Sequence, residues 1–160
     1  MNKIYTDIKQ SKKLLELGLN SDNADIYITN NVGLSGKVDG TNIIVVLKEY
    51  LNPLADCPEI IPSWSLTTLL DLLPPIIKIE GESGVFEYSI DIRKYKFNEN
   101  SIKYQIAYGN QSYKNSWHDM ISSPECQSLL DAAYSMMCWL LENNHIDIKK
   151  KSDCDDIELT

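Results

Sequence analysis

The sequence lacks the features that mark membrane, secreted and metal-binding proteins. No apolar run approaches the roughly 18 residues that a membrane helix requires, and residues 1–13 are polar, without the apolar stretch of a secretory signal. We therefore expect a cytoplasmic protein with no membrane partner. The few cysteines are too widely spaced for a zinc knuckle or a redox motif, which predicts free thiols and no metal or cofactor. They are Cys57, Cys126, Cys138 and Cys154.

The sequence is also short of positive charge. The formal net charge of the 160 residues is -8, and phosphate backbones and anionic headgroups would repel such a chain. A nucleic-acid partner is therefore not expected. An acidic surface can, however, imitate nucleic acid toward a basic protein. An acidic inhibitor that mimics nucleic acid toward a host enzyme is one alternative function.

The clearest local signal is a C-terminal helix between Ser123 and Ile146. Ser123 suits the N-cap, Pro124 the first helical position, and Asn143–Asn144 a left-handed stop. Helical spacing gathers the apolar residues of this segment into one stripe. The stripe, which predicts a core helix, contains Cys126, Leu129, Leu130, Ala133, Met136, Met137, Leu140 and Leu141.

Further helices and strands are predicted in the rest of the chain. Asp7–Leu17 is predicted as a helix capped by Thr6 or Asp7, and a second helix runs from Ser63 or Ser65 to Leu73. Strands are expected at Asp25–Thr29 and Ile43–Leu47, whereas the proline-rich segment Asn52–Pro62 is expected to be irregular. Asn110–Ser122 connects to the last helix, with a short strand near Trp117.

Residues 76–108 alternate apolar and polar side chains, which is typical of an antiparallel meander. The alternation changes parity after Ile92, and a β-bulge near Arg93–Lys94 would restore it. The resulting pairs are Ile90–Tyr108, Ile92–Ile106, Tyr95–Tyr104 and Phe97–Ile102. We predict a two-layer α+β fold: an antiparallel sheet with a bulged hairpin, covered by about three helices, the C-terminal one longest. Residues 1–148 form one domain, and residues 149–160 a charged, disordered tail.

Two groups of residues hint at chemistry without a supporting motif. His118–Asp119 could act as a base beside Cys126 or Cys57, which gives a Cys/His hydrolase as a second alternative function. Lys94, Lys96 and Lys103 form a basic cluster on the solvent face of the hairpin, with Arg93 nearby. Their tyrosine neighbours, Tyr95 and Tyr104, are assigned to the buried face, which weakens single-stranded nucleic-acid binding.

Trp139 lies outside the apolar stripe of the last helix. Its helical neighbours Ser128, Ala132 and Ser135 are small, and small residues around a large aromatic ring make a good contact surface. We predict an interaction surface at these four residues, covered either by the loops of the meander or by a second subunit, and we favour the second subunit of a homo-oligomer.

Three segments, residues 10–25, 61–74 and 130–143, resemble a group of small uncharacterised proteins encoded by phages and mobile elements of anaerobic gut bacteria. They contain Gln10–Leu19 with Ala24–Asp25, Ile61–Leu66 with Leu69, Leu70, Leu73 and Pro74, and Leu130–Ala133 with Met137–Asn143. The resemblance implies no known activity. We therefore expect a non-enzymatic accessory protein that acts through protein–protein contacts.

Overall fold

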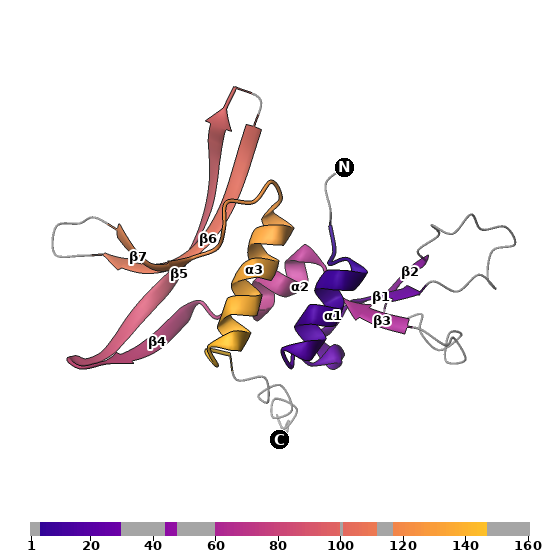
Figure 1. Cartoon of the computed structure of the whole chain (residues 1–160), viewed down its shortest axis with the longest axis horizontal. Helices are drawn as coiled ribbons and strands as arrows, with labels where there is room; N and C mark the ends of the chain where they lie inside the picture. Colours follow the sequence, from indigo (N-terminus) through magenta and orange to yellow (C-terminus); the bar gives the residue numbers. More distant parts are fainter. Residues whose placement is uncertain (1–3, 30–43, 48–59, 100, 112–116, 147–160) are drawn as a thin grey trace, which may run out of the picture.

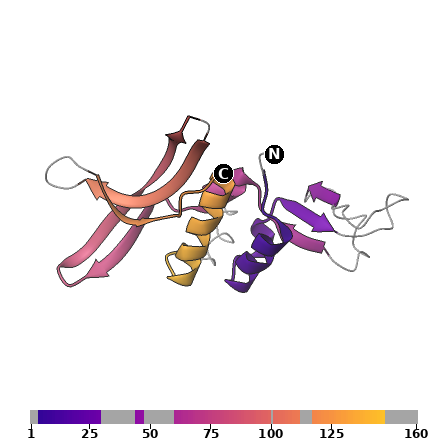
Figure 2. The same ribbon diagram turned by 45° about the horizontal axis from the view of Figure 1, so that its top comes forward.

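The computed structural model of the chain describes residues 4–29, 44–47, 60–99, 101–111 and 117–146. These residues form two antiparallel sheets and three α-helices, the last helix being the longest, which confirms the predicted α+β class (Figure 1). The helices lie between the two sheets, as both ribbon views show (Figures 1 and 2). The sequence predicted a single sheet, whereas the described residues form two. The predicted tail at 149–160 lies outside the described residues.

Local capping chemistry sets the bounds of the first two helices. Helix α1 (Ile8–Glu16) begins at Asp7, which forms a capping box with Gln10, and Gly18 takes the left-handed conformation (φ 93°) just after the helix ends. A short 3-10 helix, η1 (Ser21–Asn23), follows. Helix α2 (Leu66–Leu72) is capped by Ser65, which accepts a hydrogen bond from the Thr68 N–H. Both predicted helices are confirmed.

Helix α3 (Leu129–Glu142) starts later than predicted, with Ser128 rather than Ser123 as its N-cap. Ser123 is used elsewhere: its Oγ accepts from the Ile106 N–H at 3.0 Å, and its own N–H donates to the Ile106 carbonyl at 2.7 Å. Cys126 then forms an isolated bridge with Tyr104. The segment before α3 is therefore held to the sheet. The predicted end is confirmed, because Asn144 is left-handed with φ 55°.

The smaller sheet contains a strand that the sequence did not predict. Its order is β2 (Ile44–Leu47), β1 (Ile26–Thr29) and β3 (Ile60–Ser63). Strand β3 falls in the segment expected to be irregular, and it tolerates Pro62 because it lies at the sheet edge. Buried hydroxyl groups tie it to the N-terminal segment: the Thr6 Oγ1 lies 3.0 Å from the Ser63 Oγ and 2.8 Å from the Ser11 Oγ.

The larger sheet is the predicted meander, in the order β4 (Ile76–Gly81), β5 (Gly84–Asn98), β6 (Ser101–Gln111) and β7 (Trp117–Ser122). The short strand expected near Trp117 is present as β7.

The register of β5 on β6 confirms the pairs Ile90–Tyr108 and Ile92–Ile106. The predicted bulge is misplaced, because the register shifts between Lys96 and Asn98 and not at Arg93–Lys94. Alternation therefore continues unbroken to Lys96, and two predicted pairs are wrong. Arg93 stays on the sheet face away from α3, where it finds charged partners. The observed pairs beyond Ile92 are Lys94–Tyr104, Tyr95–Lys103 and Lys96–Ile102.

The hydrophobic core lies between α3, α2, α1 and the adjoining face of β6. The α3 stripe is confirmed as core from Leu130 onward, while Cys126 and Leu129 are only half-buried. From β6, Ile106 and Tyr108 are completely buried, and the Tyr108 hydroxyl donates to the Pro74 carbonyl at 2.6 Å. The core thus fixes one end of the larger sheet to the helices.

Candidate interaction surfaces

Trp139 projects from α3 and is half-buried by its own chain. The left-handed turn at Asn144 folds the chain back, and the His145 N–H donates to the Leu140 carbonyl at 2.9 Å. The His145 ring consequently stacks on the Trp139 ring, with centroids 5.1 Å apart and planes 19° apart. One face of the indole is therefore covered within the same chain.

The small residues predicted to surround Trp139 do not form one surface with it. Ala132 has an exposed fraction of 0% and belongs to the core. Ser128 caps α3: its hydroxyl lies 2.6 Å from the Asp131 carboxylate and accepts from the Asp131 N–H. Of the predicted set, only Ser135 and Trp139 line the same groove. Helical spacing correctly placed Trp139 outside the buried stripe of α3. It did not show that the core covers the neighbouring Ala132.

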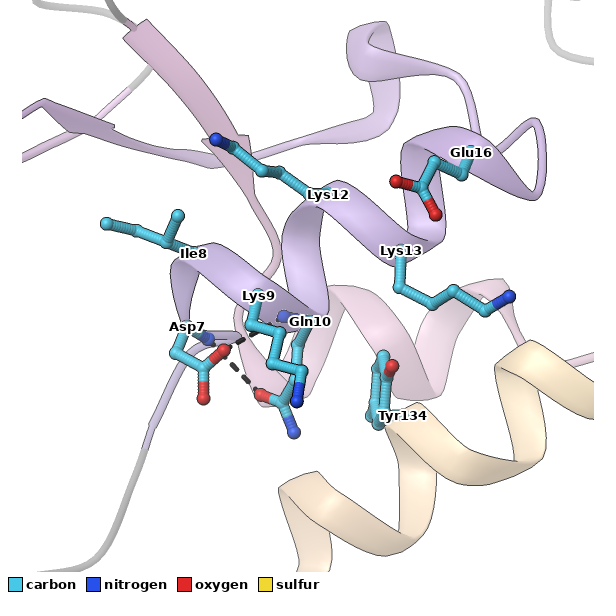
Figure 3. Close-up of a pocket in the computed structure, with 8 residues that line it drawn as sticks. All are labelled: Asp7, Ile8, Lys9, Gln10, Lys12, Lys13, Glu16 and Tyr134. Atoms are coloured by element: carbon cyan, nitrogen blue, oxygen red, sulfur yellow. Dashed lines mark hydrogen bonds between the residues drawn. The ribbon is translucent and has the colours of Figure 1, made fainter.

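Two shallow hollows meet along the exposed side of α3. The larger, about 890 Å³, lies between α1 and α3 and is lined by lysines, acids and Tyr134 (Figure 3). The smaller, about 360 Å³, lies between α3 and the segment that precedes it. Lys13 and Tyr134 line both hollows. Lys13 also pairs with Glu142 at 3.6 Å, so charge in this groove is partly neutralised.

The thiols on and before α3 are poorly suited to nucleophilic catalysis. Burial raises the pKa of the Cys138 thiol, and it also raises the pKa of the Cys126 thiol. A raised pKa leaves less thiolate at neutral pH, and the thiolate is the nucleophilic form.

The structure does not bring His118 and Cys126 together. His118 pairs with Asn110 on β6, whereas Cys126 bridges to Tyr104 on the same strand. The two β6 positions are six residues apart, which corresponds to about 20 Å along a strand. Cys57 lies outside the described residues. Within the described ranges, no group of three His, Cys, Asp or Glu side chains is placed to hold a metal, and no helix is long and apolar enough to cross a membrane.

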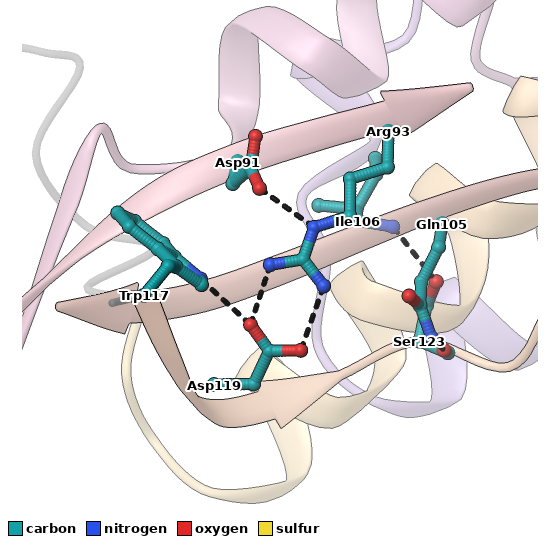
Figure 4. A network of polar contacts seen from close by, with 7 residues as sticks. All are labelled: Asp91, Arg93, Gln105, Ile106, Trp117, Asp119 and Ser123. Atoms are coloured by element: carbon teal, nitrogen blue, oxygen red, sulfur yellow. Dashed lines mark hydrogen bonds and ion pairs between the residues drawn. The ribbon is translucent and has the colours of Figure 1, made fainter. Parts of the chain in front are cut away.

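A charged network crosses the larger sheet on the face away from α3 (Figure 4). The two Arg93 Nη atoms donate to both Asp119 carboxylate oxygens at 2.7 and 2.6 Å, and the Arg93 Nε donates to Asp91 at 2.6 Å. The Trp117 indole N–H also donates to Asp119, at 2.7 Å. The hydrogen bonds from Arg93 hold the pKa of the Asp119 carboxyl below its usual value. Arg93 is thus neutralised and does not join the basic cluster.

The network explains why β6 carries small residues at this point. Arg93 on β5 and Asp119 on β7 lie on either side of β6, so their ion pair spans that strand. On this face of β6, Gln105 lies opposite Arg93 and Gly109 opposite Asp119, with Ala107 between them; Ala107 and Gly109 are buried. A Cβ at Gly109 would clash with the His118 carbonyl oxygen and would lie 2.6 Å from the Trp117 Nε1.

The β5–β6 end of the sheet extends past the helices in both ribbon views (Figures 1 and 2). We refer to residues 92–99 and 101–104 as the hairpin arm. It carries three large apolar side chains that remain exposed: Ile92 (48%), Phe97 (61%) and Ile102 (48%). Lysines surround them, with the Lys94 Nζ 5.9 Å from the Tyr104 ring centre and the Lys103 Nζ 5.2 Å from that of Phe97.

The observed register corrects the predicted faces of the arm. Lys94 and Lys96 lie opposite Tyr104 and Ile102, so these lysines share a face with the aromatic ring from which they were predicted to be separated. Lys103 lies opposite Tyr95 on the other face. No carboxylate within the described part of the chain forms an ion pair with these three lysines. The arm is therefore both apolar and locally basic.

Comparison with known proteins identifies no relative of this chain: no protein-family model, no curated protein and no solved structure matches it.

Proposed function

We propose that this protein acts by binding another protein, without catalysis, and that the hairpin arm is its main contact surface. The observation that carries the proposal is the exposure of Ile92 and Ile102 on one face of a projecting hairpin, with Phe97 also exposed, next to Lys103 of the other face. Exposed apolar patches with a polar rim mark protein interaction sites. The lysines of the arm form such a rim, and lysine at strand edges also discourages unspecific pairing.

The two alternative functions find less support. A hydrolase would need His118 close to a reactive thiol, and the β6 register separates His118 from Cys126. A nucleic-acid mimic would need a row of unpaired acids. Several described acids instead cap helices or pair with cations: Asp7, Asp91, Glu87, Asp119 and Glu142.

Capture of a partner protein from a lysate of the producing cell tests whether the hairpin arm is the contact surface. The double variant Ile92→Ser/Ile102→Ser should lose the partner that the unaltered protein retains, because two half-exposed apolar contacts are removed. Ile76→Ser is the matched control, since Ile76 is 46% exposed on β4, outside the arm. Equal capture by the double variant and the control would contradict the proposal.

Three further parts of the proposal rest on the sequence. The cytoplasm is the proposed location, and a phage or mobile-element origin is proposed from the resemblance of residues 10–25, 61–74 and 130–143. A homo-oligomer is proposed with the second copy on the open side of Trp139, the other face being stacked on His145. Light scattering of the unaltered protein and Trp139→Ala tests the oligomer, and a monomer in both would exclude it.

A further inference from the structure

Among the described strands, none pairs with one edge of β5 along the hairpin arm. Strand β4 pairs with β5 only as far as Ser89, and the last backbone contact on that side is the Ile90 N–H to the Pro75 carbonyl at 3.1 Å. Strand β5 continues to Asn98. Within the described ranges, no strand other than β6 pairs with it beyond that contact. The edge is therefore open along the arm.

The direction of the free backbone groups follows from the register. In an antiparallel strand the N–H and C=O of one residue point to the same side, and the side alternates from residue to residue. Because the Ile90 N–H points toward β4, those of Ile92, Lys94 and Lys96 point outward from β6 as well. Each of these residues offers one donor and one acceptor. An extended chain laid along this edge would meet a regular ladder of three residues.

The side chains beside this ladder specify the chemistry of its partner. Ile92, Lys94 and Lys96 project on one face of β5, with an apolar residue at the base and two positive charges toward the tip. On the opposite face, Arg93 is already paired with Asp91 and Asp119. A strand added here would therefore match best with acidic side chains at alternate positions and an apolar side chain facing Ile92.

We propose, on the basis of the proposed function of the arm, that its partner is an extended acidic peptide segment that adds a strand to the edge of β5 at Ile92–Lys96. Recognition by strand addition takes affinity from main-chain hydrogen bonds and selectivity from alternate side chains. The open edge supplies the hydrogen bonds, and Lys94 and Lys96 supply the selectivity.

The same edge fits a second copy of this chain poorly. Antiparallel pairing of two β5 edges about Lys94 would set that lysine against its own copy and Ile92 against Lys96. Like charges directly opposite one another destabilise paired strands. The lysines thus disfavour self-pairing while favouring an acidic strand.

A single-stranded nucleic acid also fits less well. Its sugar–phosphate backbone offers acceptors, so the carbonyl groups of Ile92, Lys94 and Lys96 would stay without donors at the contact. The chain carries a net charge of -8, which repels phosphate outside the arm.

The test is a nuclear magnetic resonance titration of the full-length protein with a seven-residue Val–Glu peptide, Val-Glu-Val-Glu-Val-Val-Val, which in antiparallel pairing sets Glu opposite Lys96 and Lys94 and Val opposite Ile92. We expect the amide signals of Ile92, Lys94 and Lys96 to shift and their hydrogen exchange to slow. A Val–Lys peptide should bind about tenfold more weakly, because the cross-strand pairs become repulsive. A Val–Glu peptide methylated on alternate amide nitrogens should also bind about tenfold more weakly, because it cannot donate the main-chain hydrogen bonds to β5.

Charge-reversed variants supply the controls on the protein side. Lys94→Glu/Lys96→Glu should invert the preference toward the Val–Lys peptide, whereas Lys9→Glu/Lys12→Glu on α1 should leave it unchanged. Equal binding of the methylated and unmethylated peptides would overturn strand addition. Tighter binding of a thymidine oligonucleotide than of the peptide, lost in Lys94→Glu/Lys96→Glu, would overturn the peptide assignment. Either result would overturn the acidic-strand inference without affecting the capture test of Ile92→Ser/Ile102→Ser. Failure of the inference and failure of the proposed function are therefore distinguishable.

Discussion

Replacing Asp119 with Asn tests whether the charged network fastens β5 to β7. The change leaves the shape of the side chain nearly intact, but it removes the charge that Arg93 contacts through two hydrogen bonds. Hydrogen bonds to charged groups contribute about 1.5–3 kcal/mol when shielded from water, and exposed ion pairs about 0–1 kcal/mol. The side chains of Arg93 and Asp119 are 28% and 33% exposed, so an intermediate loss of about 1–2 kcal/mol is expected.

The pH dependence of this loss gives the sharper measurement. Arg93 lowers the pKa of Asp119 in the folded state, so the carboxylate stabilises the fold above the unfolded pKa. That stabilisation disappears as the pH falls through the folded value. Urea unfolding should therefore separate Asp119→Asn from the unaltered protein at pH 7, and the difference should shrink below about pH 4.

A double-mutant cycle isolates the pair. The cycle combines Asp119→Asn with Arg93→Gln and should give a coupling free energy of about 1 kcal/mol or more at pH 7. Asp71→Asn, at an exposed position of α2, is the control for loss of a negative charge, and its effect on the free energy of unfolding should be within about 0.5 kcal/mol. A coupling free energy near zero, or a loss for Asp119→Asn that is equal at pH 7 and pH 3, would refute the reasoning.

Two further predictions follow from packing and from thiol chemistry. Gly109→Ala should lower the free energy of unfolding by about 1–3 kcal/mol, because its new Cβ would clash with the His118 carbonyl oxygen. Thermal denaturation measures this loss, and an unchanged melting temperature would contradict the close packing at β6. The thiols of Cys126 and Cys138 should react with iodoacetamide at pH 8 more slowly than glutathione does, because their raised pKa leaves little thiolate. Peptide mass mapping resolves the individual cysteines, and alkylation at the rate of a free thiol would show that burial does not protect them.

Local features of the sequence predicted much of the fold. The caps at Asp7 and Ser65, the stop at Asn144 and the apolar stripe from Leu130 depend on neighbours within one or two helical turns, and the structure confirms all of them. The alternation of β5 likewise predicted the Ile90–Tyr108 pair. Trp139 was correctly placed outside the stripe, although its cover by His145 was not foreseen.

The errors arose where one residue has two possible partners. A serine hydroxyl suits a helix N-cap or a backbone N–H in a sheet equally well, and only the tertiary structure assigns Ser123 to Ile106 and Ser128 to α3. The bulge was predicted at Arg93–Lys94 because the apolar alternation changes parity there. The sequence did not indicate that Arg93 pairs with Asp119, because the two residues are far apart in the chain. Because the observed bulge lies beyond Lys96, Lys94 is on the same face of the sheet as Tyr104.

The sequence by itself thus determined the α+β class, most helix ends and the strands of the meander, because hydrophobic periodicity and capping act over a few residues. Only the tertiary structure decided that the β5–β6 end extends past the helices with Ile92, Phe97 and Ile102 exposed. An alternating pattern shows that a strand has an apolar face. Whether another layer covers that face depends on where the helices end in space, which no local pattern records.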